Sequence, residues 1–214
     1  MSDDDPASSA PSAITPKAGY HHGDLRAQLI AAVRDLVETH GPDGFSVAEA
    51  ARRAGVSSAA PYKHFKDRHE ILRGVVSEAM DRLRAAMEAG AAAHPKGSLE
   101  AVAAVGQAYV RFARAEPGVF RLVFGLTEGH EDAPDLLEKG QGCFGVVVGT
   151  VANRIGLPPT SAEVLRLAYI LWSFVHGHSF LTIDMKNKMV SAEIDDWAYL
   201  MAVSRSILSG AAQT

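Results

Sequence analysis

Residues 46–66, SVAEAARRAGVSSAAPYKHFK, follow the order of a helix-turn-helix: a helix-start signal, a glycine, and then small and polar side chains. Ser46 with Glu49 three residues later is the capping-box pattern that begins a helix, and Gly55 allows the sharp turn that ends it. A second helix is expected to follow the turn. In such a unit the second helix carries side chains that bind phosphates and base edges in the major groove of DNA.

The second helix carries the candidate contacts. Lys63 can donate to guanine O6 or N7, and Ala59 or Ala60 can meet a thymine methyl group, although a phosphate is the alternative partner of Lys63. Tyr62 is expected to hold a phosphate through its hydroxyl group, and for His64 a solvated surface is the alternative. The candidate DNA-binding residues are Ser46, Arg52, Ser57, Ser58, Ala59, Ala60, Tyr62, Lys63, His64 and Lys66.

Pro61 limits where the second helix can begin. It has no backbone N–H, which is tolerated only in the first turn of a helix, so the helix begins no earlier than about Ser57 and can be capped by Ser57 or Ser58. The surface that remains for base contact is poor in long side chains. Recognition is therefore expected to depend partly on DNA shape.

The segment closely resembles the DNA-binding domain of TetR-type transcriptional repressors, whose second helix ends in Tyr-x-x-Phe before a charged turn and a long helix. Here these are Tyr62-Lys63-His64-Phe65 and the turn and helix that follow at 66–72. The resemblance covers about residues 20–73 and includes YHHGDLR at 20–26. Trp172-Ser173-Phe174-Val175-His176-Gly177 is similar to the Trp-x-x-x-His-Gly signature of one class of TetR C-terminal domains. Pro61 departs from the Leu or Ile that this family commonly has.

The resemblance implies a DNA-binding regulator, by family tendency a repressor, that acts as a homodimer through helices at about 161–184 and 191–209. It also implies a cavity for a small, largely apolar effector between the helices around 80–180. For each residue in question, ordinary core packing is the alternative, and for His176 a satisfied core histidine. The candidate pocket residues are Met80, Met87, Tyr109, Phe112, Phe120, Phe124, Trp172 and His176.

Apolar residues at helical spacing predict an all-α fold of about nine helices. Three regions are expected: a disordered tail at 1–19, a helix-turn-helix domain at 20–66, and a ligand-binding and dimerisation domain at 67–214. The capping pattern of Asp67 and Glu70 predicts the long helix that joins the last two. The other helices are expected at about 24–40, 98–116, 119–124, 135–155, 160–185 and 191–209.

The charge of the chain is unevenly distributed. Its 214 residues carry a net charge of −4, but residues 17–73 hold nine Lys and Arg against seven Asp and Glu. The DNA end is thus the more basic one, as phosphate binding requires. No apolar run reaches the ~20 residues of a membrane span, and the acidic N-terminus has no hydrophobic signal region, so a cytoplasmic protein is expected.

Other functions have weaker support. Gly140-Gln141-Gly142-Cys143-Phe144-Gly145 matches G-x-G-x-x-G, but no strand pattern precedes it, which argues against a dinucleotide site. Cys143 is the single cysteine and is expected to be a buried apolar residue, with a redox-sensing thiol as the alternative. No catalytic residue, metal or cofactor is expected. The remaining alternative is a helix-turn-helix protein without effector control.

Overall fold

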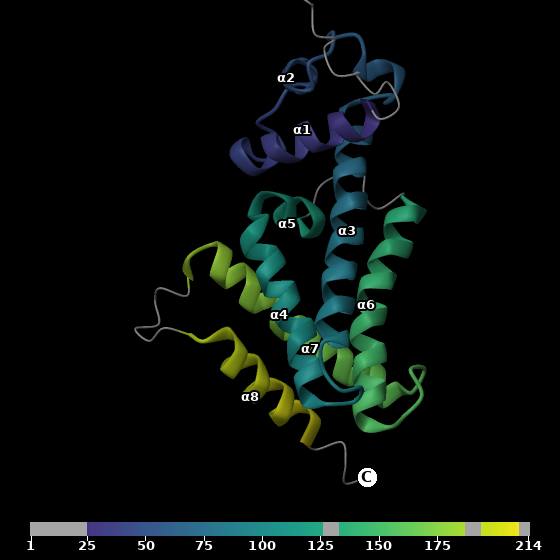
Figure 1. Cartoon of the computed structure of the whole chain (residues 1–214), viewed down its shortest axis with the longest axis vertical. Helices are drawn as coiled ribbons and strands as arrows, with labels where there is room; N and C mark the ends of the chain where they lie inside the picture. The colour runs from purple at the N-terminus through teal and green to yellow at the C-terminus, as the bar shows by residue number, and fades with distance from the viewer. Residues whose placement is uncertain (1–24, 126–132, 187–193, 210–214) are drawn as a thin grey trace, which may run out of the picture.

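The computed structural model describes residues 25–125, 133–186 and 194–209 (Figure 1). In these ranges the chain forms eight α-helices and one short 3-10 helix, and no strand, which confirms the predicted all-α fold. The expected tail at 1–19, most of the motif at 20–26 and the expected start of the last helix at 191 lie outside the described residues. None of the described helices has both the length and the hydropathy of a membrane span.

The first helices form as predicted. Helix α1 (Leu25–His40) buries one apolar stripe that includes Leu29, Val33 and Leu36. Helix α2 (Val47–Arg53) begins at Ser46, whose hydroxyl oxygen accepts the N–H of Glu49 at 3.1 Å. The chain then turns at Gly55, whose φ of +70° is readily adopted only by glycine.

The predicted second helix from about Ser57 is wrong in extent, because the chain forms only a single 3-10 turn, η1 (Pro61–Lys63). The N–H of Ala60 donates to the carbonyl of Ser57 at 3.0 Å, and that of Lys63 to the carbonyl of Ala60 at 3.2 Å. Pro61 has no N–H with which to continue an α-helical ladder back to Ser57. The predicted serine cap is also wrong, because the turn begins at Ala60 without a side-chain cap.

Helix α3 (Arg68–Ala92) runs from the N-terminal helices into the centre of the C-terminal half (Figure 1). Its start is capped as predicted: Asp67 accepts the N–H of Glu70 at 2.8 Å, and the side chain of Glu70 accepts the N–H of Lys66 at 2.6 Å. This hydrogen bond from the Glu70 N–H is the main reason that the pKa of Asp67 is lowered. Helix α3 packs against α1 near its start and against the C-terminal helices further along.

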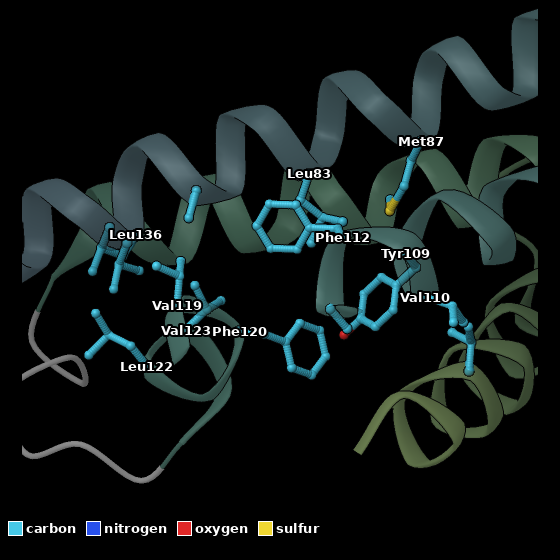
Figure 2. Packing of buried hydrophobic residues seen from close by; sticks show 14 of the residues in the cluster. Leu83, Met87, Tyr109, Val110, Phe112, Val119, Phe120, Leu122, Val123 and Leu136 are labelled. Carbon is cyan, nitrogen blue, oxygen red and sulfur yellow. The ribbon is translucent and has the colours of Figure 1, made fainter. Parts of the chain in front are cut away.

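Five helices complete the C-terminal half: α4 (Leu99–Ala115), α5 (Pro117–Phe124), α6 (Pro134–Ile155), α7 (Ala162–Ile183) and α8 (Asp196–Leu208). Helix α4 packs against α3, α7 and α8, and α6 packs against α3 and α7. Ser98 caps α4 by accepting the N–H of Ala101 at 3.1 Å. Figure 2 shows Leu83 and Met87 extending from α3 toward Tyr109 of α4, which places α3 and α4 on either side of the core.

One glycine within α6 and the glycine that follows its last residue should respond in opposite ways to alanine. Gly145 is exposed, with nothing within 4 Å of an added Cβ, so Gly145→Ala should raise the free energy of unfolding by about 0.5–1 kcal/mol. Gly156 ends the helix at a φ of +73° with equal space around it, so Gly156→Ala should lower that free energy by about 1–2 kcal/mol. Urea unfolding at one protein concentration measures both, and a stabilised Gly156→Ala would contradict this account of the helix end.

Candidate functional site

The η1 turn and the residues just after it expose their polar side chains to solvent and bury two apolar ones. Tyr62 is 63% exposed and Lys63, His64 and Lys66 are exposed, whereas Pro61 and Phe65 are buried. The guanidinium of Arg26 lies 5.2 Å from the centre of the Phe65 ring. The buried residues fix the turn against α1 and leave the tyrosine hydroxyl and lysine ammonium groups in solvent.

The structure brings the predicted DNA-binding residues onto one exposed segment of the chain and one neighbouring helix. All ten are exposed except Ala60, which is half-buried. Ser46 already accepts a hydrogen bond as the cap of α2, but its hydroxyl can still donate one. The guanidinium of Arg52 lies 3.8 Å from Glu49 and is 78% exposed, so this pair adds little stability and can be exchanged for a phosphate.

Arg68, the first residue of α3, contacts the loop before α2, and the sequence pattern did not predict this contact. Its guanidinium lies 4.6 Å from the centre of the Phe45 ring and donates to the carbonyl of Pro42. An arginine in a charged turn gives no signal of such a contact. The loop before α2 is therefore held directly to the first turn of α3.

A cavity of about 240 Å³ lies within the C-terminal half, between residues of α3, α4, α5, α6, α7 and α8. Of the predicted pocket residues it gathers Met80, Met87, Tyr109, Phe124 and Trp172. The described lining does not include Phe112, Phe120 or His176. The two phenylalanines are buried in the core. The lining residues that the sequence did not single out include Leu83, Cys143, Phe144, Thr150, Leu171, Phe174, Leu200, Val203 and Ser204.

The lining of the cavity is apolar and, among the described residues, carries no charged side chain. Burial raises the pKa of the Tyr109 hydroxyl and also that of the Cys143 thiol, whose Sγ donates to the carbonyl of Met80 at 3.4 Å. Both groups are therefore neutral at physiological pH. Cys143 is half-buried and not fully buried as expected, but its neutral, hydrogen-bonded thiol still favours an apolar core residue over a redox sensor.

His176 lies behind the cavity wall, half-buried in aromatic rings. Its Nδ1 is 2.7 Å from the Tyr109 hydroxyl, and its ring centre is 5.0 Å from those of Phe124 and Phe180. Burial lowers the pKa of His176, so the neutral ring can accept a hydrogen bond from Tyr109. His176 thus fixes the direction of a cavity-lining hydroxyl group.

His178 has a different environment. It is buried, with its Nε2 3.1 Å from Asp196, a carboxylate that also binds Arg114 of α4. The two histidines therefore have separate partners, as their spacing predicts. Within the described ranges, no group of three or more potential metal ligands is found.

One face of α7 remains apolar and exposed. Residues 165, 169, 173, 177 and 181 recur every four positions, so they form one ridge along the helix, and all are exposed. Leu165, Tyr169 and Leu181 of this ridge are 42%, 60% and 51% exposed. Small residues, Ser173 and Gly177, lie between them. A second helix could therefore approach this ridge closely.

Comparison with known proteins gives two family matches in the expected order. Residues 29–75 match the model described as bacterial regulatory proteins, tetR family, and residues 102–204 match the model described as tetracyclin repressor-like, C-terminal domain. The nucleoid occlusion factor SlmA of Vibrio vulnificus is 28% identical over 113 residues, which are 50% of this chain and 55% of that protein. The chain thus spans about half the length of that curated relative.

Solved structures share the fold over most of its length. A protein of unknown function from Rhodococcus sp. RHA1 is 31% identical, with a TM-score of 0.77 over 92% of this chain and 100% of its own. The TetR family regulator PfmR of Thermus thermophilus is 18% identical, with a TM-score of 0.61 over 85% and 97%. FadR of Bacillus subtilis, solved with stearoyl-CoA, is 18% identical, with a TM-score of 0.59 over 87% and 97%.

The buried position of His176 predicts a pH dependence of stability. Because the pKa of His176 in the folded chain lies below the ordinary value of 6.5, the unfolded chain takes up a proton at this residue first, and stability falls as the pH drops below about 6.5. His176→Gln removes this titration. Its free energy of unfolding should therefore decline less than that of the wild type between about pH 7.5 and about pH 5. Urea titrations at both pH values measure the difference, with exposed His69→Gln as control; parallel declines would contradict the assignment.

Proposed function

Because the chain belongs to the tetR family of bacterial regulatory proteins, we propose that it is a ligand-responsive transcriptional regulator. It acts as a repressor that binds a palindromic or nearly palindromic operator as a homodimer and leaves it when a small, largely apolar effector binds. Its site of action is the cytoplasm, where the DNA lies. The observation that carries the proposal is the η1 turn, which exposes Tyr62 and Lys63 above a buried Pro61 and Phe65.

Contacts to DNA follow from the chemistry of this turn. The hydroxyl of Tyr62 and the ammonium of Lys63 are donors suited to phosphate oxygens, and Lys63 can also reach the acceptors of guanine. Ser57, Ser58 and Ala59 lie just before them in the chain and are exposed. A short turn with few long side chains supports recognition that depends partly on DNA shape.

A homodimer is proposed because one such turn contacts too few bases for useful specificity, whereas two related by a twofold axis read two half-sites. The exposed ridge of α7 supports an interface formed by α7 and α8, within the ranges 161–184 and 191–209 expected from the sequence. Large side chains at 165, 169 and 181 lose exposed apolar surface when a second copy covers them. Ser173 and Gly177 between them let the two helices approach.

The effector is proposed to be neutral as well as apolar. Transfer of a carboxylate or phosphate into a cavity without a partner charge is strongly unfavourable, and the described lining offers none. An engineered cavity of about 150 Å³ holds benzene, so a cavity of about 240 Å³ has room for a somewhat larger ring compound. The aromatic rings of Tyr109, Phe124 and Trp172 favour a flat ligand.

Release from DNA is proposed to pass through α3. The effector favours a conformation in which α3 changes its tilt, and this alters the distance between the two recognition turns of the dimer. Since the two half-sites have a fixed spacing, a mismatched dimer loses affinity. The alternative, DNA binding without effector control, is supported by the burial of Phe112 and Phe120 in ordinary core.

Substitutions in the η1 turn should weaken DNA binding. Tyr62→Phe removes one hydroxyl contact and should lower affinity for a duplex from upstream of the gene roughly twofold to tenfold. Lys63→Ala should make the negative slope of log affinity against log salt shallower by about 1 if the side chain meets a phosphate. Fluorescence anisotropy at several salt concentrations measures both, with exposed Lys96→Ala as control. Wild-type affinity and salt slope in both variants would contradict a DNA-binding role for the turn.

Acetophenone and benzoate have the same number of non-hydrogen atoms but differ in charge. Acetophenone should bind at least roughly tenfold more tightly, because only benzoate must bury a charge. Isothermal titration calorimetry measures the affinities, and acetophenone should release the duplex. Ala103→Leu fills the cavity and should abolish binding, whereas Ala86→Leu on the exposed side of α3 should not. Equal binding of both probes would contradict the neutral class, and binding of neither would favour the alternative without effector control.

A further inference from the structure

The first turn of α5 is capped by a residue from the DNA-binding half, the described residues 25–66. Helix α5 begins at Pro117, which has no N–H, and the free N–H groups of its first turn belong to Gly118 and Val119. Glu38 of α1 accepts both: Oε2 lies 3.0 Å from the Gly118 nitrogen, and Oε1 lies 2.7 Å from the Val119 nitrogen. Both carboxylate oxygens of Glu38 are thus engaged by the start of α5.

The position of Glu38 in α1 points to a role outside that helix. It lies in the last turn of α1, where the helix dipole disfavours a negative charge, whereas the start of α5 offers the positive end of another dipole. At Gly118 the two backbones almost touch, because an added Cβ would lie 2.6 Å from the carbonyl oxygen of Val37. Figure 1 shows α5 directly beneath α1.

The other end of α5 forms part of the cavity wall. Val123 and Phe124 line the cavity, and Phe124 packs against Phe120 of the same helix at 4.9 Å between ring centres. Phe120 in turn meets the ring of Tyr109 edge-on at 5.5 Å, and Figure 2 shows these two rings side by side. Helix α5 is only eight residues long, so one short rigid element extends from the cavity to α1.

The junction before α5 is fixed to α3 as well. Glu116, the residue that precedes α5, binds Arg82 of α3 through both carboxylate oxygens, at 3.2 and 2.6 Å. A ligand that displaces Phe124 therefore acts on a helix whose start is attached to α3 on one side and to α1 on the other. The DNA-binding half thus meets the C-terminal half through the continuous helix α3 and where α1 packs against α5, with Glu38 at that second contact.

We propose that Glu38 is a positioning residue that transmits occupancy of the cavity to the DNA-binding half through α5. The inference rests on the proposed function, because it takes the cavity as the effector site. Ligand contact at Phe124 shifts α5, and the paired hydrogen bonds of Glu38 carry this shift to α1 and so to the η1 turn. Without them the DNA-binding half is oriented by α3 and apolar contacts alone, and it responds less to the ligand.

Hydrogen exchange of the full chain with and without acetophenone tests this proposal. In the wild type, acetophenone should change the exchange of backbone amides in residues 25–66. Glu38→Gln keeps the size of the side chain but presents an amide N–H₂ group to one of the two donors, so this change should become clearly smaller while acetophenone affinity stays within roughly threefold. In Glu38→Ala, the amides of Gly118 and Val119 should exchange roughly fivefold to tenfold faster, as for a lost helix cap.

Asp35→Asn is the matched control, since it removes one negative charge from the same helix, where Asp35 pairs only with its exposed neighbour Arg34 among the described contacts of its side chain. It should respond to acetophenone as the wild type does. A wild-type response of residues 25–66 in Glu38→Gln would overturn the role of Glu38 but not the effector site. The same conclusion would follow if residues 25–66 did not respond in an acetophenone-bound wild type. Failure of acetophenone to bind at all would overturn the effector site itself.

Discussion

Helix α3 runs along a single hydrophobic core that extends from the N-terminal helices to the C-terminal ones, and this shared helix is the constraint on which the rest of the structure depends. Near its start, Ile71, Leu72 and Val75 are buried, and α3 packs against α1 of the DNA-binding half. Further along the helix, Leu83 and Met87 line the cavity. A helix of 25 residues is about 38 Å long and resists bending, so a displacement of one end also displaces the other.

Charge and apolar surface are separated along this axis. Exposed cations and hydroxyl groups surround the η1 turn, whereas the described lining of the cavity is neutral. A chain with a net charge of −4 can in this way offer a basic face to phosphates. The same separation supports the choice of a neutral effector, because an anion would meet no partner in the cavity but several near the DNA-binding turn.

Local signals predicted much of this arrangement, since helix caps depend on residues close in sequence. Ser46, Asp67 and Ser98 all cap the helices that their patterns predicted. The missing N–H of Pro61 predicts a limit to where a helix begins, whereas the structure has only a single 3-10 turn at this position. Long-range contacts had no signal. Helical periodicity separates a buried face from an exposed one but cannot separate Phe124, on the cavity, from Phe112, in the core, and nothing local relates Glu38 to a helix 80 residues away.

The most direct test of the account is the distance between the two recognition turns of a dimer. Arg53 is exposed on α2, and Cys143 is the single cysteine, so Arg53→Cys in a Cys143→Ser background accepts one spin label per chain next to the turn. Double electron–electron resonance should give one main distance in the free protein and a distance changed by several ångströms with acetophenone bound. An absence of dipolar coupling, or the same distance distribution with and without bound acetophenone, would contradict the account.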